Sequence, residues 1–290
     1  MPRYRAGMDS LVAVEDVTKS AEDGAVVVLD ATLHLPSADR DAHAEFAAGH
    51  IPGARFLDLA SLSDPAADAP KAVPSAAQFA ERLATLGVEP GAAVVLYDDS
   101  VLRTSARAWL IFRLHGWRDV AVLDGGLEAW KNAGLPVERG AAEVARSSLV
   151  ESDLRRSEGL LRGKAQMLAN IEQGAEQVVD ARDEDRFNGK ADTVHGLPGG
   201  HIPGARNLPY TRLLTSDGRL RPDGELRAAF ADAGVDLAEP IVGTCGSGVT
   251  ASVVLFAAHR LGAERLALYD GSWLDWGADP ATPKAKGGAG

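Results

Sequence analysis

The sequence predicts an α/β protein of two tandem domains, each an open parallel sheet flanked by helices. First, the heptapeptide GHIPGAR at residues 49–55 recurs unchanged at 200–206. Second, the repeat distance of roughly 150 residues is the length of a domain and far exceeds that of a solenoid repeat. Third, short apolar runs alternate with longer helix-like stretches in both copies, which is typical of a parallel sheet covered on both sides.

The strands are predicted where apolar residues follow one another without alternation, because a parallel strand is buried on both faces. The clearest such runs in the first copy are residues 26–29, 94–96 and 120–123. Helices are predicted at 105–115 and 250–261, and Gly262 marks the end of the second of these.

The chain is expected to divide into four segments. These are an N-terminal domain at 9–137, a linker at 138–153, a C-terminal domain at 154–278 and a flexible tail at 279–290. The linker is polar and rich in alanine. The tail is mostly Ala, Pro, Lys and Gly, which offer little apolar surface to bury.

Composition excludes several classes of protein. The 290 residues are 46% hydrophobic and 24% charged, as in ordinary globular proteins. A net charge of −11 argues against binding to nucleic acid or to an anionic membrane surface. We expect no membrane span and no signal peptide, because apolar stretches of sufficient length are missing. With a single cysteine, neither an internal disulfide nor a cysteine-based zinc site is expected, so the predicted location is the reducing cytoplasm.

The single cysteine, Cys245, lies in a loop that joins a strand to a helix. The apolar run at 241–244 precedes it, and in open α/β sheets ligands bind at this carboxyl edge of the strands. Gly246 and Gly248 let the backbone turn its N–H groups toward the sulfur, and the helix start adds partial positive charge. Both effects favour the reactive thiolate. The alternative, a buried cysteine acting as a small apolar residue, fits poorly with a turn that has glycines on both sides of Ser247.

The first copy serves as an internal control. Alignment of the two copies on the run that precedes Cys245 places Asp98 opposite it. The loop at 98–103 contains neither a thiol nor a glycine. We therefore expect the N-terminal domain to be catalytically inactive and only the C-terminal domain to be chemically competent.

Several repeated or strand-end residues are expected to be scaffold. His50 and His201 occur in both copies, although one copy has no cysteine, so a catalytic Cys–His pair is disfavoured. Asp30 and Asp180 are expected to accept hydrogen bonds at strand ends. Arg182 is expected to tie loops together.

Taken together, these features resemble the 3-mercaptopyruvate sulfurtransferases of the rhodanese superfamily. The features are the tandem domains with HIPGA in each, a cysteine only in the second, and the loop CGSGVT at 245–250. The segment YDGSW at 269–273 is similar to the superfamily's C-terminal signature, with Asp275 where Glu is usual. The resemblance spans residues 11–276. It implies a five-stranded parallel sheet in each domain and no metal or organic cofactor.

The resemblance also implies roles for individual residues. Cys245 attacks the donor sulfur and carries it as a persulfide, and Ser247 assists proton movement. Arg186 holds the donor carboxylate, as suits a guanidinium fork. The backbone that holds the persulfide anion belongs to Gly246, Gly248, Val249 and Thr250. Thr250 is also expected to cap the following helix.

The sequence departs from the mercaptopyruvate enzymes near the donor site. Several of those enzymes have a second substrate arginine about nine residues after the first. The segment at 190–196 contains none, and His195 is the nearest candidate replacement. Ala60 and Lys71 stand where those enzymes have an acid and a histidine. These differences affect the prediction of which sulfur donor is used more than the prediction of the reaction type.

Loop composition distinguishes related activities. Thiosulfate sulfurtransferases carry two basic residues after the cysteine, whereas residues 246–248 are neutral, and phosphatases of the same fold need Arg where Ala251 stands. We expect sulfur to move from 3-mercaptopyruvate through a Cys245 persulfide to a thiol such as reduced thioredoxin, or to cyanide, releasing pyruvate. The alternatives are a thiosulfate:cyanide sulfurtransferase and, from another class, a non-catalytic sulfur-binding or partner-docking module.

Overall fold

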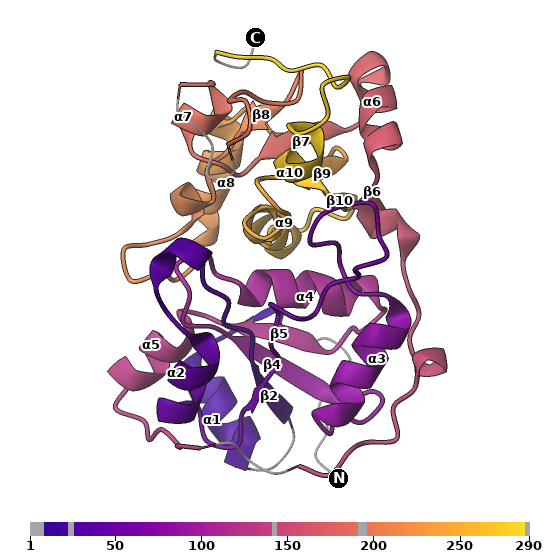
Figure 1. Ribbon diagram of the computed structural model, residues 1–290. Coiled ribbons are helices and arrows are strands. Elements are labelled where there is room, and N and C mark those ends of the chain that lie inside the picture. The colour runs from indigo at the N-terminus through magenta and orange to yellow at the C-terminus, as the bar shows by residue number, and fades with distance from the viewer. Residues whose placement is uncertain (1–8, 23–25, 141–143, 191–195, 288–290) are drawn as a thin grey trace. The chain divides into compact units, whose positions relative to one another are not determined.

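The computed structural model describes residues 9–22, 26–140, 144–190 and 196–287 (Figure 1). The chain divides into two compact units. One contains the residues up to Asp64 together with Val73–Ser157, and the other contains Pro65–Ala72 together with the residues from Glu158 onward.

Each unit contains one five-stranded sheet in which every strand pairs in parallel, so the predicted fold class is confirmed. In the first sheet the strand order is β1 (Leu11–Val12), β5 (Val120–Leu123), β4 (Ala93–Tyr97), β2 (Val26–Asp30), β3 (Arg55–Phe56). In the second it is β6 (Leu161–Arg162), β10 (Leu266–Tyr269), β9 (Ile241–Thr244), β7 (Gln177–Asp180), β8 (Arg206–Asn207).

Helices cover both faces of each sheet (Figure 1). The first unit has α1 (Val14–Glu22), α2 (Ala42–Ala48), α3 (Ala76–Thr85), α4 (Ser105–Leu114) and α5 (Gly126–Asn132), with short 3-10 turns at Pro36–Ala38 and Glu151–Asp153. The second has α6 (Lys164–Gln173), α7 (Glu184–Phe187), α8 (Asp223–Asp232), α9 (Ala251–Arg260) and α10 (Ser272–Trp276), with 3-10 turns at Glu158–Leu160 and Tyr210–Leu213. One apolar core lies beneath α1, α2 and α5, and its counterpart in the second unit lies beneath α6, α7 and α10.

The two units have the same register at the ends of their strands. Ala31 N donates to Tyr97 O at 2.8 Å, and Ala181 N donates to Thr244 O at 2.9 Å. Tyr97 therefore corresponds to Thr244, and the next residue in each unit enters the loop at the carboxyl edge of the sheet.

The loops that follow are anchored in the same way. Leu127 N donates to Asp98 O, and Trp273 N donates to Cys245 O, both at 3.0 Å. The predicted alignment of Asp98 with Cys245 is confirmed, and Leu127 corresponds to Trp273.

The central strand β9 approaches α9 closely at Gly243. A Cβ atom at this glycine would lie 2.9 Å from Leu255 Cγ, a distance that requires one of them to move. Gly243→Ala is therefore expected to lower the free energy of unfolding by about 1 to 3 kcal/mol, because overpacking strains a dense core. Urea unfolding measures the change. Gly246→Ala is the control: its Cβ would meet no atom within 4 Å, and a change within about 0.5 kcal/mol is expected there.

Asp30, at the end of β2, is a buried carboxyl group that is 3% exposed. Burial raises its pKa from 3.8 to about 6, although hydrogen bonds from Thr32 act in the opposite direction. A carboxyl group with a raised folded-state pKa contributes stability that is complete below about pH 4 and is lost as the pH rises through 6.

Asp30→Asn is therefore expected to gain stability relative to the parent between pH 4.5 and 7.5, by about 2 kcal/mol. Urea unfolding at the two pH values tests this. The matched variant is Asp180→Asn, which removes the charged partner of Arg182 and should lose stability at both pH values. An Asp30→Asn difference that does not change with pH would contradict the expectation.

The C-terminal segment differs from the expected flexible tail. Trp276 Nε1 donates to Pro283 O at 2.8 Å, and His201 and Ala285 exchange two backbone hydrogen bonds of 2.9 Å. Thr282 is 5% exposed. The expectation is wrong for residues 279–287, because backbone pairing fixes a segment that has few apolar side chains. Residues 288–290 lie outside the described residues.

The segment expected as a linker, 138–153, lies within the first unit, which extends to Ser157. His50 N donates to Glu138 O at 3.0 Å, and Glu138 N donates to His50 O at 2.8 Å. Further on, Ser147 N donates to Ala84 O at 2.9 Å. Residues 141–143 lie outside the described residues.

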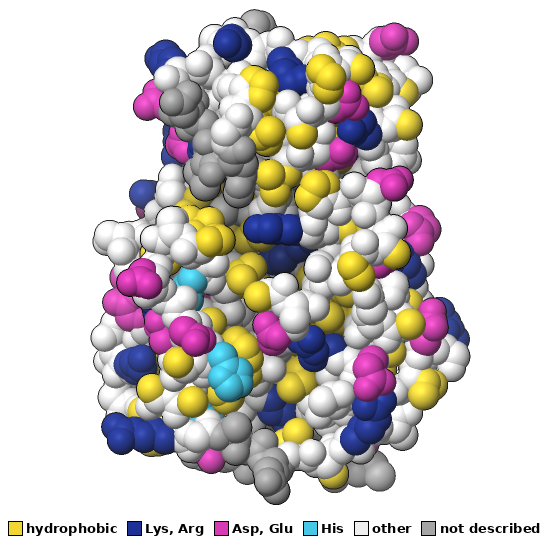
Figure 2. Space-filling view, viewed as in Figure 1, with side chains coloured by type: hydrophobic (Ala, Val, Ile, Leu, Met, Phe, Trp, Pro, Cys, Tyr) yellow, Lys and Arg dark blue, Asp and Glu magenta, His cyan; other side chains and the backbone are white. Residues whose placement is uncertain are grey.

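The surface carries charges of both signs. On the face shown in Figure 2, Lys and Arg side chains are interspersed with Asp and Glu. On this face the described Lys and Arg side chains form no continuous stripe of the kind found on nucleic-acid-binding surfaces. None of the helices in the described ranges has the length and apolar character needed to cross a membrane.

Candidate active site

Cys245 directly follows β9, the middle strand of the second sheet, and is 2% exposed. Its backbone is held from both sides. Cys245 N donates to Ser272 Oγ at 3.2 Å, and Cys245 O accepts from Trp273 N. The thiol is therefore held at the carboxyl edge of the sheet by the strand and by the start of α10.

The loop after Cys245 presents backbone donors. The N–H groups of Gly246, Ser247, Val249 and Thr250 have no hydrogen-bond acceptor among the residues that the structure describes. Gly248 adopts φ +79°, a left-handed conformation that suits glycine. Together with the N-terminus of α9, these donors form an environment that stabilises an anion next to the sulfur.

The corresponding loop of the first unit carries a negatively charged side chain, the carboxylate of Asp98. Asp98 is 2% exposed, and its two carboxylate oxygens accept from Ser100 N at 3.0 Å and from Ser105 N at 2.8 Å. Arg103 lies 3.7 Å away as a partly buried ion pair. The first loop therefore supplies its own carboxylate acceptor, whereas the N–H groups of Gly246, Ser247, Val249 and Thr250 have no acceptor among the described residues. This arrangement supports an inactive first domain and an anion-binding loop in the second.

Ser272 is a positioning residue that reasoning from the sequence did not single out. Its Oγ accepts from Cys245 N and donates to Tyr269 O at 2.9 Å, and its φ is +50°. The only signal in the sequence was its place inside the motif YDGSW.

Arg182 ties loops together, as predicted. Its Nε and Nη2 bind Asp180 at 3.0 and 2.6 Å, and Nη2 also donates to Gly200 O at 2.7 Å. The guanidinium lies 4.4 Å from the centre of the Trp273 ring. Because Trp273 also donates to Cys245 O, the contact of Arg182 with Trp273 connects the strand-end Asp180 to the Cys245 loop.

The predicted roles of Arg186, Ser247 and His195, like that of Cys245 itself, stay predictions. Arg186 lies in the short helix α7 and pairs with Asp183, its only ion-pair partner among the described residues. Its side chain is 29% exposed. Ser247 is partly buried in the loop. His195 lies outside the described residues.

Thr250 is the N-cap residue of α9, but its side chain makes no capping hydrogen bond, so the expected cap is not formed. The residue has αR dihedral angles, φ −72° and ψ −22°, rather than the extended geometry of a capping residue. Its backbone N–H remains available to the loop.

The two histidines of the repeat are buried in equivalent places. Nδ1 of His50 binds Phe46 O at 2.8 Å, and Nδ1 of His201 binds Phe187 O at 2.9 Å. Each imidazole stacks on the phenylalanine that it binds. The shared geometry in both units agrees with a scaffold role.

Within the described ranges, no group of three or more His, Cys, Asp or Glu side chains is placed to hold a metal ion.

Sequence comparison agrees with this geometry. The family model of the rhodanese-like domain matches residues 13–133 and again residues 164–279. The chain belongs to the rhodanese family. Both copies of the rhodanese domain are thus present, and the cysteine is in the second.

Two relatives are 3-mercaptopyruvate sulfurtransferases. The protein from Mus musculus is 36% identical over 276 residues, covering 94% of this chain and 92% of the relative. The protein from Escherichia coli K12 is 37% identical over 274 residues, covering 94% and 96%. The solved structure of SseA from Escherichia coli has a TM-score of 0.83 at 34% identity and covers 92% of this chain and 99% of its own.

Thiosulfate sulfurtransferases are equally similar by this measure. The protein from Bos taurus is 37% identical over 280 residues, covering 94% of this rhodanese-family chain and 92% of the relative. Overall identity does not separate the two donors, so the distinction depends on the residues around Cys245.

Proposed function

We propose that this protein is a 3-mercaptopyruvate sulfurtransferase that carries sulfur as a persulfide on Cys245. One observation carries the proposal: the cysteine lies at the carboxyl end of β9, in a loop where the N–H groups of Gly246, Ser247, Val249 and Thr250 have no other acceptor among the described residues. Such donors favour the thiolate before the reaction and the persulfide anion after it.

The reaction proceeds in two half-reactions. The Cys245 thiolate attacks the donor sulfur, and an S–S bond forms while the carbon–sulfur bond breaks. The electron pair of the broken bond passes to carbon as the enolate of pyruvate, which takes up one proton, and pyruvate leaves. Ser247 is proposed to relay that proton. An acceptor thiolate or cyanide then attacks the outer sulfur and regenerates the Cys245 thiolate.

The remaining site residues position the two anions. The N–H groups from Gly246 to Thr250 hold the persulfide, and Arg186 binds the donor carboxylate through its planar fork. His195 is the candidate for a second contact with the donor. A reduced thioredoxin or another thiol in the cytoplasm is the proposed acceptor.

The donor preference follows from the absence of charge in the loop. Residues 246–248 are Gly, Ser and Gly, whereas a dianion such as thiosulfate requires positive charge close to the sulfur. We expect kcat/KM for 3-mercaptopyruvate to exceed that for thiosulfate by at least about tenfold, a difference of about 1.4 kcal/mol.

Thiosulfate sulfurtransferase is the second candidate, because relatives with that activity are equally similar. Kinetic comparison of the two donors decides between them, and Gly246→Arg sharpens the test. A side chain at this position meets no atom within 4 Å of its Cβ, and the added charge should raise the rate with thiosulfate selectively. A parent enzyme that prefers thiosulfate would overturn the mercaptopyruvate proposal.

The intermediate is tested by mass spectrometry of the intact chain. After incubation with 3-mercaptopyruvate and removal of the donor, a species heavier by about 32 Da, one sulfur atom, is expected, and it should disappear on addition of cyanide. A protein that never shows this species would instead be a non-catalytic sulfur-binding or docking module.

A further inference from the structure

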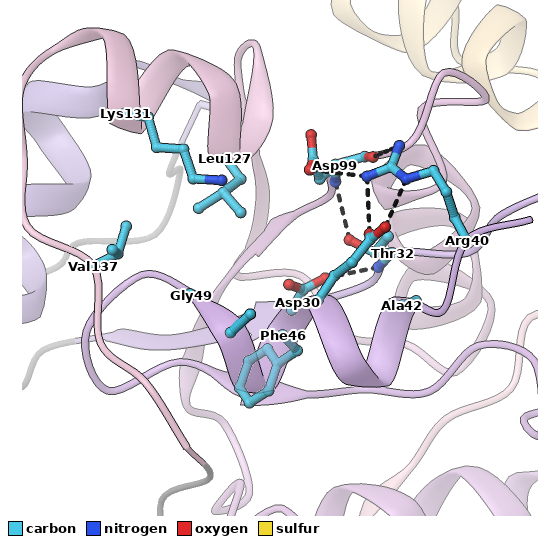
Figure 3. A pocket seen from close by; sticks show the side chains of 12 residues that line it. Asp30, Thr32, Arg40, Ala42, Phe46, Gly49, Asp99, Leu127, Lys131 and Val137 are labelled. Carbon is cyan, nitrogen blue, oxygen red and sulfur yellow. Dashed lines mark hydrogen bonds and ion pairs between the residues drawn. The ribbon is translucent and has the colours of Figure 1, made fainter.

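The first unit has a cavity of about 330 Å³ at the carboxyl ends of β2 and β4, between α2 and α5 (Figure 3). Asp30, Thr32, Gly49, Leu127 and Lys131 are among its lining residues. The cavity belongs to the domain without a cysteine, so sulfur chemistry does not explain it.

The same position in the second unit is filled by Arg182. Thr32 N donates to Asp30 Oδ1 at 2.8 Å, and Arg182 N donates to Asp180 Oδ1 at 3.0 Å, each two residues after its strand-end aspartate. Thr32 therefore stands where Arg182 does, and among the described residues no arginine pairs with Asp30; Arg40, which also lines the cavity, pairs with Glu45 and Asp99 instead.

The aromatic cover of that guanidinium is also missing from the first unit. Leu127 stands where Trp273 does, as their hydrogen bonds to Asp98 O and Cys245 O show. The indole has room in the second unit because Gly277 follows Trp276 there: a Cβ at Gly277 would lie 2.7 Å from Trp273 Nε1.

Lys131 occupies the position of Gly277. Trp130 Nε1 donates to Pro136 O and Trp276 Nε1 donates to Pro283 O, both at 2.8 Å, so these two tryptophans correspond and Lys131 follows the first of them. Where the second unit has an arginine, a tryptophan and a glycine, the first unit has Thr32, Leu127 and Lys131, and the cavity lies beside these three residues.

The cavity contains the counterparts of both groups that accept hydrogen bonds from Arg182 in the second unit. Asp30 is buried, with a pKa raised to about 6 by burial, so at neutral pH it is a carboxylate without an arginine partner. The backbone carbonyl of Gly49 corresponds to that of Gly200, which accepts from Arg182.

The charges around the cavity favour a cation. Arg40 is already bound to Glu45 at 2.7 Å and to Asp99 at 3.2 Å. Figure 3 shows Asp30 and Lys131 directed toward the cavity from opposite sides, and no ion pair joins them. The three lining carboxylates outnumber the two lining cations.

We propose that this cavity binds the guanidinium group of a small-molecule cation, seated on the Asp30 carboxylate and the Gly49 carbonyl in the place that Arg182 takes in the second unit. A planar fork makes two parallel hydrogen bonds to a carboxylate, which a compact ammonium group does not. Phe46 and Leu127 are the large apolar residues among those that line the cavity.

Binding is tested on the full chain at pH 7.5 with ethylguanidine as the probe, followed by isothermal titration calorimetry. The neutral isostere ethylurea and the compact cation ethylammonium serve as controls. A dissociation constant on the order of 1 mM is expected for so small a ligand, and the two controls should bind at least about tenfold more weakly. Equal binding of ethylguanidine and ethylurea would overturn the proposal.

Two variants locate the site. Asp30→Asn should weaken ethylguanidine binding at least about tenfold, because it removes the charge that the probe needs. The triple variant Thr32→Arg, Leu127→Trp and Lys131→Gly recreates the filled arrangement, and it should lose binding and melt at a higher temperature. Probe binding that survives in both variants would overturn the proposal.

Two further arms exclude other occupants. If the Lys131 amine itself occupied Asp30, ethylguanidine would bind only to the Lys131→Met variant, and the proposal would fail. Arginine with an acetylated amino group and an amidated carboxyl group tests whether the cavity binds an arginine side chain of another protein. If this compound binds more tightly than ethylguanidine, the proposal of a small-molecule ligand is wrong. Sulfur transfer should be unchanged in Lys131→Met, which separates this site from the proposed function.

Discussion

Replacing Cys245 with serine is expected to reduce sulfur transfer by at least about a thousandfold, because a hydroxyl neither ionises at neutral pH nor forms a persulfide. Steady-state rates with 3-mercaptopyruvate and cyanide measure the loss. Intact mass after donor treatment should show no added sulfur.

The substitution should leave the fold unchanged. Cys245 is held through its backbone N–H and carbonyl, and both contacts survive in Cys245→Ser. A melting temperature close to that of the parent is the control, and Ser247→Ala is the comparison variant, with a loss of only about tenfold for a proton relay. Substantial turnover by a folded Cys245→Ser chain would refute the assigned nucleophile.

Asp98→Ala is expected to lower the free energy of unfolding by about 3 to 5 kcal/mol. The change removes a buried carboxylate that accepts from Ser100 N and Ser105 N and that lies near Arg103. Buried donors without an acceptor, and a charge without its partner, account for the size of the effect. Urea unfolding followed by circular dichroism measures it.

The neighbouring Asp99→Ala is the matched control. Its side chain makes a partly exposed ion pair with Arg40, so a loss of only about 0.5 kcal/mol is expected. Sulfur transfer per folded molecule should be unaffected by either change. Equal destabilisation by both would show that the Asp98 carboxylate does not support its loop.

The internal repeat made most of the fold predictable. Identical segments at 49–55 and 200–206 fixed the alignment of the two copies, and apolar runs located the central strands. The strand, glycine turn and helix around Cys245 are local features, and the local pattern was sufficient to place the thiol at the edge of the sheet.

Contacts between segments that are far apart in the sequence could not be predicted from local sequence patterns. The stacking of Arg182 on Trp273 joins residues far apart in the sequence, and the role of Ser272 depends on a left-handed backbone. The C-terminal segment was misjudged because its composition suggested little to bury, whereas its backbone pairs with His201. The sequence shows that Thr32 stands in place of Arg182, but only the structure shows that a cavity lies at this position.

The pairing of His201 with Ala285 matters for anyone who shortens the chain or fuses a tag to it. A Cβ at Gly200 would lie 2.5 Å from Ala285 O, so the C-terminal segment packs directly on the residue whose carbonyl holds Arg182. Arg182 in turn lies against Trp273, the donor to Cys245 O. Removal of residues from 279 onward would remove contacts that lead through Arg182 and Trp273 to the backbone carbonyl of Cys245, so a fusion partner is best placed after Gly287.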